Sequence, residues 1–320
     1  MPHSRFSVCL AVFAVLASPG GFAQQYPSKV VRLVVPLAPG GGNDTLARYL
    51  AKPLTEALGQ QVVVENRAGG GGLVGGEFVA RAAPDGYTLM IGGSGQLVVT
   101  LLHRKPDVRE DFTAISGVLE YASLLMAHPS LPVRTVADLV KLAKARPGQI
   151  NYGSAGFGSA GHMGMEMLRI AAGIDLVHVP YKGAGPALTE VMAGQVQLLF
   201  SNPLGGIGAV RAGRVRAIAV SGKARLSTMP DVPTVSESGI PGFETTLFLG
   251  LLGPAGMPRE IVMRLNSDTV KSVQRRDFQE WLVQQGAEPA AGTPEAFATR
   301  IRSEMDKLVK VVREARIKLE

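Results

Sequence analysis

The chain has 320 residues, of which 46% are apolar and 18% charged, a composition that suits one large or two medium globular domains with hydrophobic cores. The formal net charge is +7, but the basic residues are scattered and form none of the basic blocks typical of a nucleic-acid-binding surface. The only cysteine is Cys9, so the rest of the chain has no disulfides, thiol nucleophiles or cysteine-bound metals.

Residues 1–23 are predicted to be a secretory signal peptide. Arg5 supplies the positive start, residues 6–17 form a short apolar stretch, and small residues precede a predicted cleavage site after Ala23. The apolar stretch is shorter than the roughly 20 residues that span a bilayer, which disfavours the alternative of an uncleaved anchor. Cleavage there would release an exported chain that starts at Gln24 and contains no cysteine.

The first predicted unit joins a strand over Val30–Pro36 to a helix over Thr45–Leu58 through the glycine-rich segment Leu37–Asp44. Asn43 or Asp44 is the expected N-cap of this helix. A glycine-rich turn before a helix exposes unpaired backbone N–H groups at the positive end of the helix dipole. This segment is therefore predicted to bind an anion, either a carboxylate or a phosphate.

Short apolar strands and amphipathic helices alternate through most of the chain, which predicts an α/β fold. Such strands are typical of a parallel sheet with helices on both faces. The other predicted strands are 61–65, 87–91, 150–153, 176–179, 196–200 and 215–220, and the other predicted helices are 74–82, 135–145, 162–172 and 185–193.

Residues 258–318 are predicted to be a helical tail that packs back onto an earlier domain. Two stretches lack the residues that signal the start or end of a helix: Phe112–Leu125 and Phe243–Leu252. They could cross between two lobes and place a cleft between them. The predicted division is residues 24–123 with 243–320 for one lobe and 124–242 for the other.

Four loops are expected at the carboxyl ends of strands, where α/β sheets bind ligands: Leu37–Asp44, Gly92–Gln96, Ser154–Gly161 and Ser201–Gly205. Neutral donors that converge there could hold a small anion without burying a charged side chain. The loops contain no arginine that could bind a second carboxylate through two parallel hydrogen bonds, which favours a ligand with one strongly anchored carboxylate. The side-chain donors are Asn43, Thr45, Ser94, Gln96, Ser154, Ser159, Ser201 and Asn202.

Other chemistries find less support in the sequence. Gly70–Gly75 and Gly156–Gly161 match the dinucleotide fingerprint in letters but lack the acidic residue at the end of a following strand. No histidine pair has metal-ligand spacing, and His162, which opens a helix, is a candidate donor to an anion. A hydrolase or transferase that uses Ser94 or Ser154 stays open, because catalytic triads are recognised by geometry.

The ordered motifs from Tyr26 to the C-terminus resemble the Bug/TctC family, the periplasmic receptors of tripartite tricarboxylate transporters. Many short motifs in the same order carry this resemblance. They include Val34-Val35-Pro36, Ala38-Pro39-Gly40-Gly41, Val64-Glu65-Asn66-Arg67, Pro84-Asp85-Gly86-Tyr87, Tyr152-Gly153-Ser154, His178-Val179-Pro180-Tyr181-Lys182-Gly183, Pro230-Asp231-Val232-Pro233-Thr234 and Gly253-Pro254-Ala255-Gly256.

The resemblance implies a monomeric two-lobe receptor of the type II periplasmic (Venus flytrap) class that closes on a small carboxylate. It implies no enzymatic activity and no cofactor, and its partners would be permease subunits of a tripartite tricarboxylate-type transporter or a sensor. Loops 37–44 and 154–159 would hold the carboxylate from both lobes, partly through waters. The candidate ligand-binding residues are Leu37, Ala38, Gly40, Gly41, Asn43, Asp44, Ser94, Gln96, Ser154, Ala155, Gly156, Phe157, Ser159, His162, Ser201 and Asn202.

The chain departs from the family pattern at four positions. Asn43 stands where Thr or Ser is common, and Phe248 stands where Trp is common. Pro106 and Met257 are also unusual for the family. The changes at Asn43 and Phe248 could alter the ligand, so no relative's ligand transfers to this chain from sequence alone.

Overall fold

A computed structural model of the chain describes residues 26–314, with side chains as far as residue 310, so the predicted signal peptide lies outside the described residues. The strands are β1 (Val31–Val35), β2 (Val62–Asn66), β3 (Thr88–Gly93), β4 (Phe112–Ala122), β5 (Leu124–Ala127), β6 (Asn151–Ser154), β7 (Val177–Pro180), β8 (Leu198–Ser201), β9 (Arg216–Val220), β10 (Thr246–Pro254) and β11 (Ala287–Pro289). The helices are α1 (Gly42–Leu58), α2 (Leu73–Ala80), α3 (Ser94–His103), α4 (Val136–Ala145), α5 (Ala160–Ala172), α6 (Ala184–Met192), α7 (Pro203–Arg211), α8 (Arg259–Gln274), α9 (Arg276–Gln284) and α10 (Pro294–Glu314), with a 3₁₀ turn at Gly70–Gly72.

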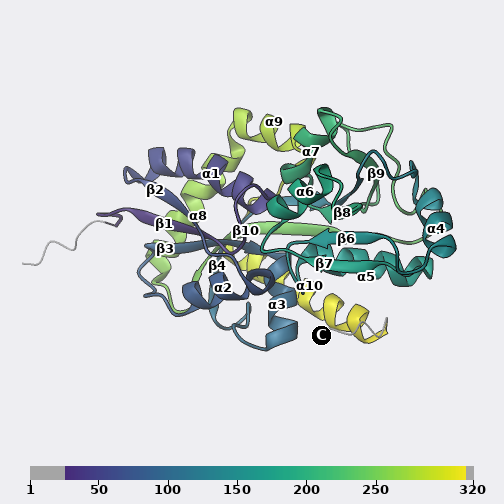
Figure 1. Cartoon of the computed structure of the whole chain (residues 1–320). Helices are drawn as coiled ribbons and strands as arrows, with labels where there is room; N and C mark the ends of the chain where they lie inside the picture. The colour runs from purple at the N-terminus through teal and green to yellow at the C-terminus, as the bar shows by residue number, and fades with distance from the viewer. Residues whose placement is uncertain (1–25, 315–320) are drawn as a thin grey trace, which may run out of the picture.

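The strands form two separate sheets, and each sheet with its helices makes one lobe (Figure 1). Lobe 1 contains the sheet β11-β4-β10-β3-β1-β2, and lobe 2 contains the sheet β7-β6-β8-β5-β9. The predicted α/β architecture with two lobes is therefore confirmed. The prediction that the sheets are parallel is wrong, because both sheets are mixed. β10 runs antiparallel to β3 and β4, and β5 runs antiparallel to β8 and β9.

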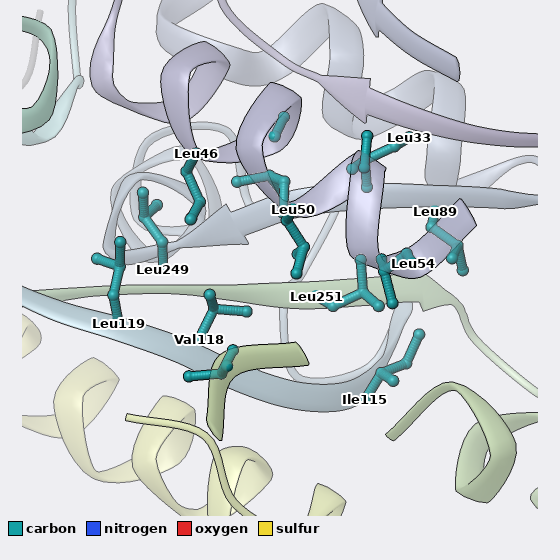
Figure 2. Close-up of a cluster of buried hydrophobic side chains, with 14 of the residues drawn as sticks. Leu33, Leu46, Leu50, Leu54, Leu89, Ile115, Val118, Leu119, Leu249 and Leu251 are labelled. Atoms are coloured by element: carbon teal, nitrogen blue, oxygen red, sulfur yellow. The ribbon is translucent and has the colours of Figure 1, made fainter. Parts of the chain in front are cut away.

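Helices cover both faces of the lobe 1 sheet. One buried cluster joins the sheet to α1, α8 and α9, and a second cluster on the other face joins it to α2, α3 and α10. Figure 2 shows how α1 contributes: Leu46, Leu50 and Leu54 lie four residues apart on one face of the helix, toward strand residues such as Leu249 and Leu251. This packing fixes the start of α1 at the edge of lobe 1 that faces lobe 2 (Figure 1).

The lobe 2 sheet has the same layered arrangement. The side chains of α4 and α5 pack on one face, and those of α6 and α7 pack on the other. In residues 26–314 no helix is both long enough and apolar enough to cross a bilayer.

Two chain segments connect the lobes, and one buried serine joins them. The chain passes from β4 to β5 at Ser123 and returns from β9 to β10 through residues 221–245. Ser221 is fully buried, and its hydroxyl accepts the Ser123 N–H (2.8 Å) and donates to the Thr245 carbonyl (2.8 Å). Backbone bonds link the same residues, from Ser221 N–H to the Ser123 carbonyl and from Thr245 N–H to the Ser221 carbonyl.

The two lobes are closed on each other at the side opposite this hinge. The Ala38 N–H of lobe 1 donates to the Lys182 carbonyl of lobe 2 at 3.0 Å. A Cβ added to Gly185 at the start of α6 would lie 2.2 Å from the Pro39 carbonyl oxygen, so only glycine allows this approach. The backbone of lobe 2 therefore lies directly against the backbone of lobe 1.

Replacing Ser221 by Ala should lower the free energy of unfolding by about 1–3 kcal/mol, because it leaves the buried Ser123 N–H without its acceptor. Urea denaturation of the ligand-free protein measures this loss. Ser227→Ala, at an exposed position, is the matched control and should change stability by less than about 0.5 kcal/mol. Equal stability of the two variants would contradict the role of Ser221 at the hinge.

Candidate functional site

A cavity of about 50 Å³ lies between the two lobes, beyond the carboxyl ends of strands from both sheets. Open α/β sheets bind their ligands at this end of the strands. The lining residues are Leu37, Ala38, Gly41, Gly42, Asn43, Asp44, Gly71, Gly95, Gln96, Tyr121, Ala155, Ser159, Ala160, Gly161, Ala184, Ser201, Asn202 and Leu249.

Five helices begin at this cavity, two from lobe 1 and three from lobe 2. Gly42, Gly95, Ala160 and Ala184 belong to the first turns of α1, α3, α5 and α6, and Asn202 directly precedes α7. The N-terminal end of each helix carries about half a positive elementary charge and backbone N–H groups without an intrahelical acceptor. The cavity is therefore suited to an anion.

The helix starts differ in how they are capped. Ser159 accepts the His162 N–H to cap α5, and Asn202 accepts the Leu204 N–H to cap α7. The N-caps of α1 and α6 are Gly41 and Gly183, which have no side chain to accept such a bond. The first-turn N–H groups of α1 and α6 consequently depend on another acceptor. The predicted cap of α1 by Asn43 or Asp44 is wrong, because both residues lie inside the first turn.

Asp44 organises the start of α1 and does not bring a free charge to the cavity. The side chain is 5% exposed and accepts bonds from Gly40 N–H, Asn66 Nδ2 and Arg48 Nε, each at 3.0 Å. Burial alone would raise the pKa of Asp44, but the bonds from Arg48, Gly40 and Asn66 outweigh it and hold the pKa below its ordinary value. Asp44 is thus an ionised carboxylate whose charge Arg48 offsets.

The remaining polar groups of the cavity are neutral. Among the lining residues that the structure describes, Asp44 and Tyr121 are the ionisable ones, and none is Lys, Arg or His. Burial raises the pKa of Tyr121, so its hydroxyl stays protonated. Residues 26–310 hold no group of three or more His, Cys, Asp or Glu side chains that could bind a metal ion. An anion in this cavity would be held by helix dipoles and neutral donors.

Ser94 and Gln96 at the start of α3 stabilise the lobe 1 side of the site. The Ser94 hydroxyl accepts the Phe248 N–H of β10 at 3.0 Å, and Gln96 Oε1 accepts the Gly93 N–H at 2.8 Å. Gln96 lines the cavity, whereas Ser94 is engaged with β10 behind it. The Ser94 hydroxyl therefore has a structural partner and does not line this cavity.

Two stacked imidazoles support the lobe 2 loop 154–161. His178 Nε2 lies 2.6 Å from the Ser154 hydroxyl, which also accepts the Gly156 N–H at 3.0 Å. His162 stacks on His178 with ring centroids 4.1 Å apart, and its Nδ1 accepts the Gly158 N–H at 3.2 Å. These bonds hold the loop from beneath, so both histidines position the loop without lining the cavity.

Ten of the sixteen predicted ligand-binding residues line the cavity: Leu37, Ala38, Gly41, Asn43, Asp44, Gln96, Ala155, Ser159, Ser201 and Asn202. The other six lie next to it. Gly40 donates to Asp44, Ser94 binds β10, Ser154 and His162 lie under the lobe 2 loop, Gly156 lies in that loop, and Phe157 is half exposed. Contact with a ligand stays a prediction for all sixteen residues.

Sequence reasoning missed several lining residues. Tyr121 ends a strand that looks like an ordinary crossing segment, and its position at the cavity depends on how the lobes meet. Gly71 lies in the Gly70–Gly75 cluster, and Ala184 directly follows the motif Tyr181-Lys182-Gly183. Both could have been assigned, because each lies at the start of a helical turn. Gly42, Gly95, Ala160 and Gly161 lie within the predicted ligand-binding loops but were not named as candidate residues, and Leu249 was missed.

A larger hollow of about 670 Å³ lies at the amino ends of β1 and β3, on the surface of lobe 1. Its basic residues Lys29, Arg32 and Arg81 are paired with Asp85, Glu65 and Glu77, respectively. Residues of lobe 1 alone line it, and the helix starts described above do not contribute to it. The smaller cavity between the lobes is therefore the better candidate for ligand binding.

The chain is similar to known periplasmic binding proteins. The family description "Tripartite tricarboxylate transporter family receptor" (TctC) matches residues 46–317. The periplasmic binding protein BugD is 32% identical and superposes with a TM-score of 0.88 over 92% of this chain and 99% of its own. Rpa4515 of R. palustris, solved with adipate, is 34% identical with a TM-score of 0.86 over 91% of this chain and 98% of its own. MatC from Rhodopseudomonas palustris, solved with bound malate, is 31% identical with a TM-score of 0.85 over 90% of this chain and 100% of its own.

The half-buried His178 predicts an acid-sensitive stability. Burial first, and then the charge of His162, lower the pKa of His178 from 6.5 to about 4, and Glu166 opposes them. Between pH 6.5 and 4 the folded protein thus binds fewer protons at this site than the unfolded chain. The contribution of neutral His178 to stability is complete above about pH 6.5 and is lost as the pH falls toward 4.

Unfolding by urea at several pH values tests this prediction. The variant His178→Gln keeps a hydrogen-bonding group near Ser154 but does not titrate, so its stability should fall less between pH 7 and pH 4 than that of the unmodified protein. His103→Gln, at the exposed end of α3, is the matched control. The same pH dependence in the His178→Gln variant and in the unmodified protein would rule out the assigned role.

Proposed function

The chain belongs to the tripartite tricarboxylate transporter receptor family, and we propose that it captures a small carboxylate in the cavity between its lobes and presents it to membrane permease subunits. Members of this family are periplasmic solute-binding receptors, and the chain is such a receptor and not an enzyme. The serines that a hydrolase would use do not line the cavity: Ser94 is bonded to the β10 backbone, and Ser154, although its hydroxyl lies 2.6 Å from His178 Nε2, is fully buried.

The convergence of five helix starts on one cavity carries the proposal. The first-turn N–H groups of α1 and α6 have no capping side chain, and both helices lie at the cavity. A carboxylate accepts several N–H bonds at once, and charge-assisted bonds of this kind are stronger than neutral ones. The ligand's carboxylate would therefore lie between α1 of lobe 1 and α6 of lobe 2.

Closure of the lobes is the proposed binding step. Residues 24–123 with 243–320 would form one rigid body and residues 124–242 the other, with the hinge at Ser123 and Ser221. The cavity is lined from both sides, so a ligand that binds one lobe first completes its hydrogen bonds only when the second lobe closes. The closed surface would then be recognised by the permease, or by a sensor in its place.

The solved relatives indicate which ligands to test first. Rpa4515 was solved with adipate and MatC with malate, both small aliphatic dicarboxylates. The cavity of about 50 Å³ is small, and its neutral donors match a carboxylate better than a bulky or cationic ligand. We propose that this chain binds a compact carboxylic acid. We also propose that residues 1–23 direct the export of the chain and that the protein is a monomer.

A binding experiment with the chain from Gln24 onward tests the function. Amino acids and mono-, di-, tri- and aromatic carboxylates, with adipate and malate among them, would be screened by thermal shift and then by calorimetry. A ligand at about 100 times its Kd stabilises the folded protein by roughly 2.7 kcal/mol, and mass spectrometry should recover it unchanged. If no carboxylate stabilises the protein, and denaturation releases no co-purified ligand, the carboxylate proposal is wrong.

A pair of glycine variants links binding to closure. Gly185→Ala places a Cβ against the Pro39 carbonyl of the other lobe and should weaken binding of the carboxylate found in the screen at least tenfold. Gly208→Ala, in the neighbouring helix α7, meets open space and should leave the affinity unchanged. Both variants should fold, because neither Cβ enters the core of a lobe. Unchanged affinity in Gly185→Ala would contradict binding by closure.

A further inference from the structure

The side chain of Asn202 has an unexplained donor at the cavity. Asn202 is 7% exposed and lines the cavity, and its Oδ1 accepts the Leu204 N–H at 2.9 Å to cap α7. This bond fixes the orientation of the amide, because a flipped amide would set two donors against each other. The Nδ2 group is buried and has no hydrogen-bond partner among the described residues. A buried donor left unpaired costs free energy, so its presence needs an explanation.

Asn202 lies at the contact between the lobes. A Cβ on Gly42, the first residue of α1, would lie 2.5 Å from Asn202 Cγ, so the amide packs directly on the start of α1. That helix start has no capping side chain, as described above. The unpaired amide of lobe 2 and the uncapped N–H groups of lobe 1 are therefore neighbours.

Tyr121 is the second polar group beside Asn202. It is 7% exposed, lies at the end of β4 in lobe 1 and lines the same cavity. Burial raises the pKa of Tyr121, and a hydrogen-bonding contribution from the Asn202 side chain lowers it in part, although the two groups do not meet the geometry of a hydrogen bond in this structure. The hydroxyl thus remains protonated and available as a donor.

We propose that Asn202 Nδ2, with the Tyr121 hydroxyl beside it, must be met by an oxygen acceptor of the ligand before the lobes close stably. The inference rests on the proposed function and names the atoms that make closure depend on the ligand. Without an acceptor, closure buries an unpaired amide next to the positive start of α1. With a carboxylate in place, the amide, the hydroxyl and the helix N–H groups share its oxygens. Asn202 therefore determines specificity, because a ligand without an acceptor at this point leaves the donor unpaired.

Closure in the absence of any ligand gives a test that does not require the ligand's identity. The chain from Gln24 onward has no cysteine, so dyes can be attached at Lys52→Cys on α1 and Lys141→Cys on α4, both exposed positions in different lobes. Asn202→Ser keeps an oxygen that caps α7 but removes the amide. Energy transfer between the dyes measures the ratio of closed to open molecules. Without ligand, this ratio should be about tenfold higher in the Asn202→Ser variant than in the unmodified protein.

Matched variants separate this effect from a loss of structure. Thr135→Ser changes the N-cap of α4, far from the cavity, and should leave the closed-to-open ratio unchanged. Asn202→Asp keeps the shape and the cap but replaces the donor by an anionic oxygen. It should therefore weaken the binding of adipate and malate at least a hundredfold, or by about 2.7 kcal/mol.

A double-mutant cycle tests the part played by Tyr121. Tyr121→Phe and Asn202→Ser should each weaken the binding of adipate or malate about tenfold, and the double variant should lose less than the product of the two. The inference is overturned if Asn202→Ser leaves the ligand-free closed-to-open ratio unchanged. The proposed function fails separately, if no carboxylate binds the unmodified protein.

Discussion

The contact of the two lobes brings like-signed helix ends together around one cavity. Closure sets the starts of α1 and α3 in lobe 1 against those of α5, α6 and α7 in lobe 2, around about 50 Å³ of space. Each start carries positive partial charge and unpaired N–H groups, so the closed form without an anion is electrostatically unfavourable. The proposed anionic ligand would remove that cost without a Lys or Arg side chain in the cavity.

The rest of the fold places these helix starts. Parallel strands β1 and β3 in one sheet and β6 and β8 in the other direct their carboxyl ends, and the helices that follow, toward the gap between the lobes. Ser221 joins the two crossing segments through hydrogen bonds, and we propose that the lobes rotate about this point. Asp44 and the stacked histidines keep the loops in shape from behind, which leaves the cavity wall to backbone groups and small side chains.

Local patterns predicted much of this arrangement. The glycine-rich segment 37–44, the loops after β6 and β8, and the α/β class follow from turn residues and hydrophobic periodicity, and the fold class is confirmed. The antiparallel course of β10 could not be predicted, because its apolar residues suit either direction. Helices α3 and α7 were missed because their first turns are rich in glycine. Tyr121 reaches the cavity only through the contact of the two lobes, which no local pattern encodes.

A crystal structure of the exported chain with a bound carboxylate, adipate or malate first, tests the central claim most directly. The account predicts carboxylate oxygens within hydrogen-bond distance of the first-turn N–H groups of α1 and of Asn202 Nδ2, with no Lys or Arg side chain in contact. A carboxylate bound instead in a second cavity, of about 500 Å³ and lined by Ser94, Ser123, Met163, Thr245, Arg300 and Lys307 among others, would contradict it.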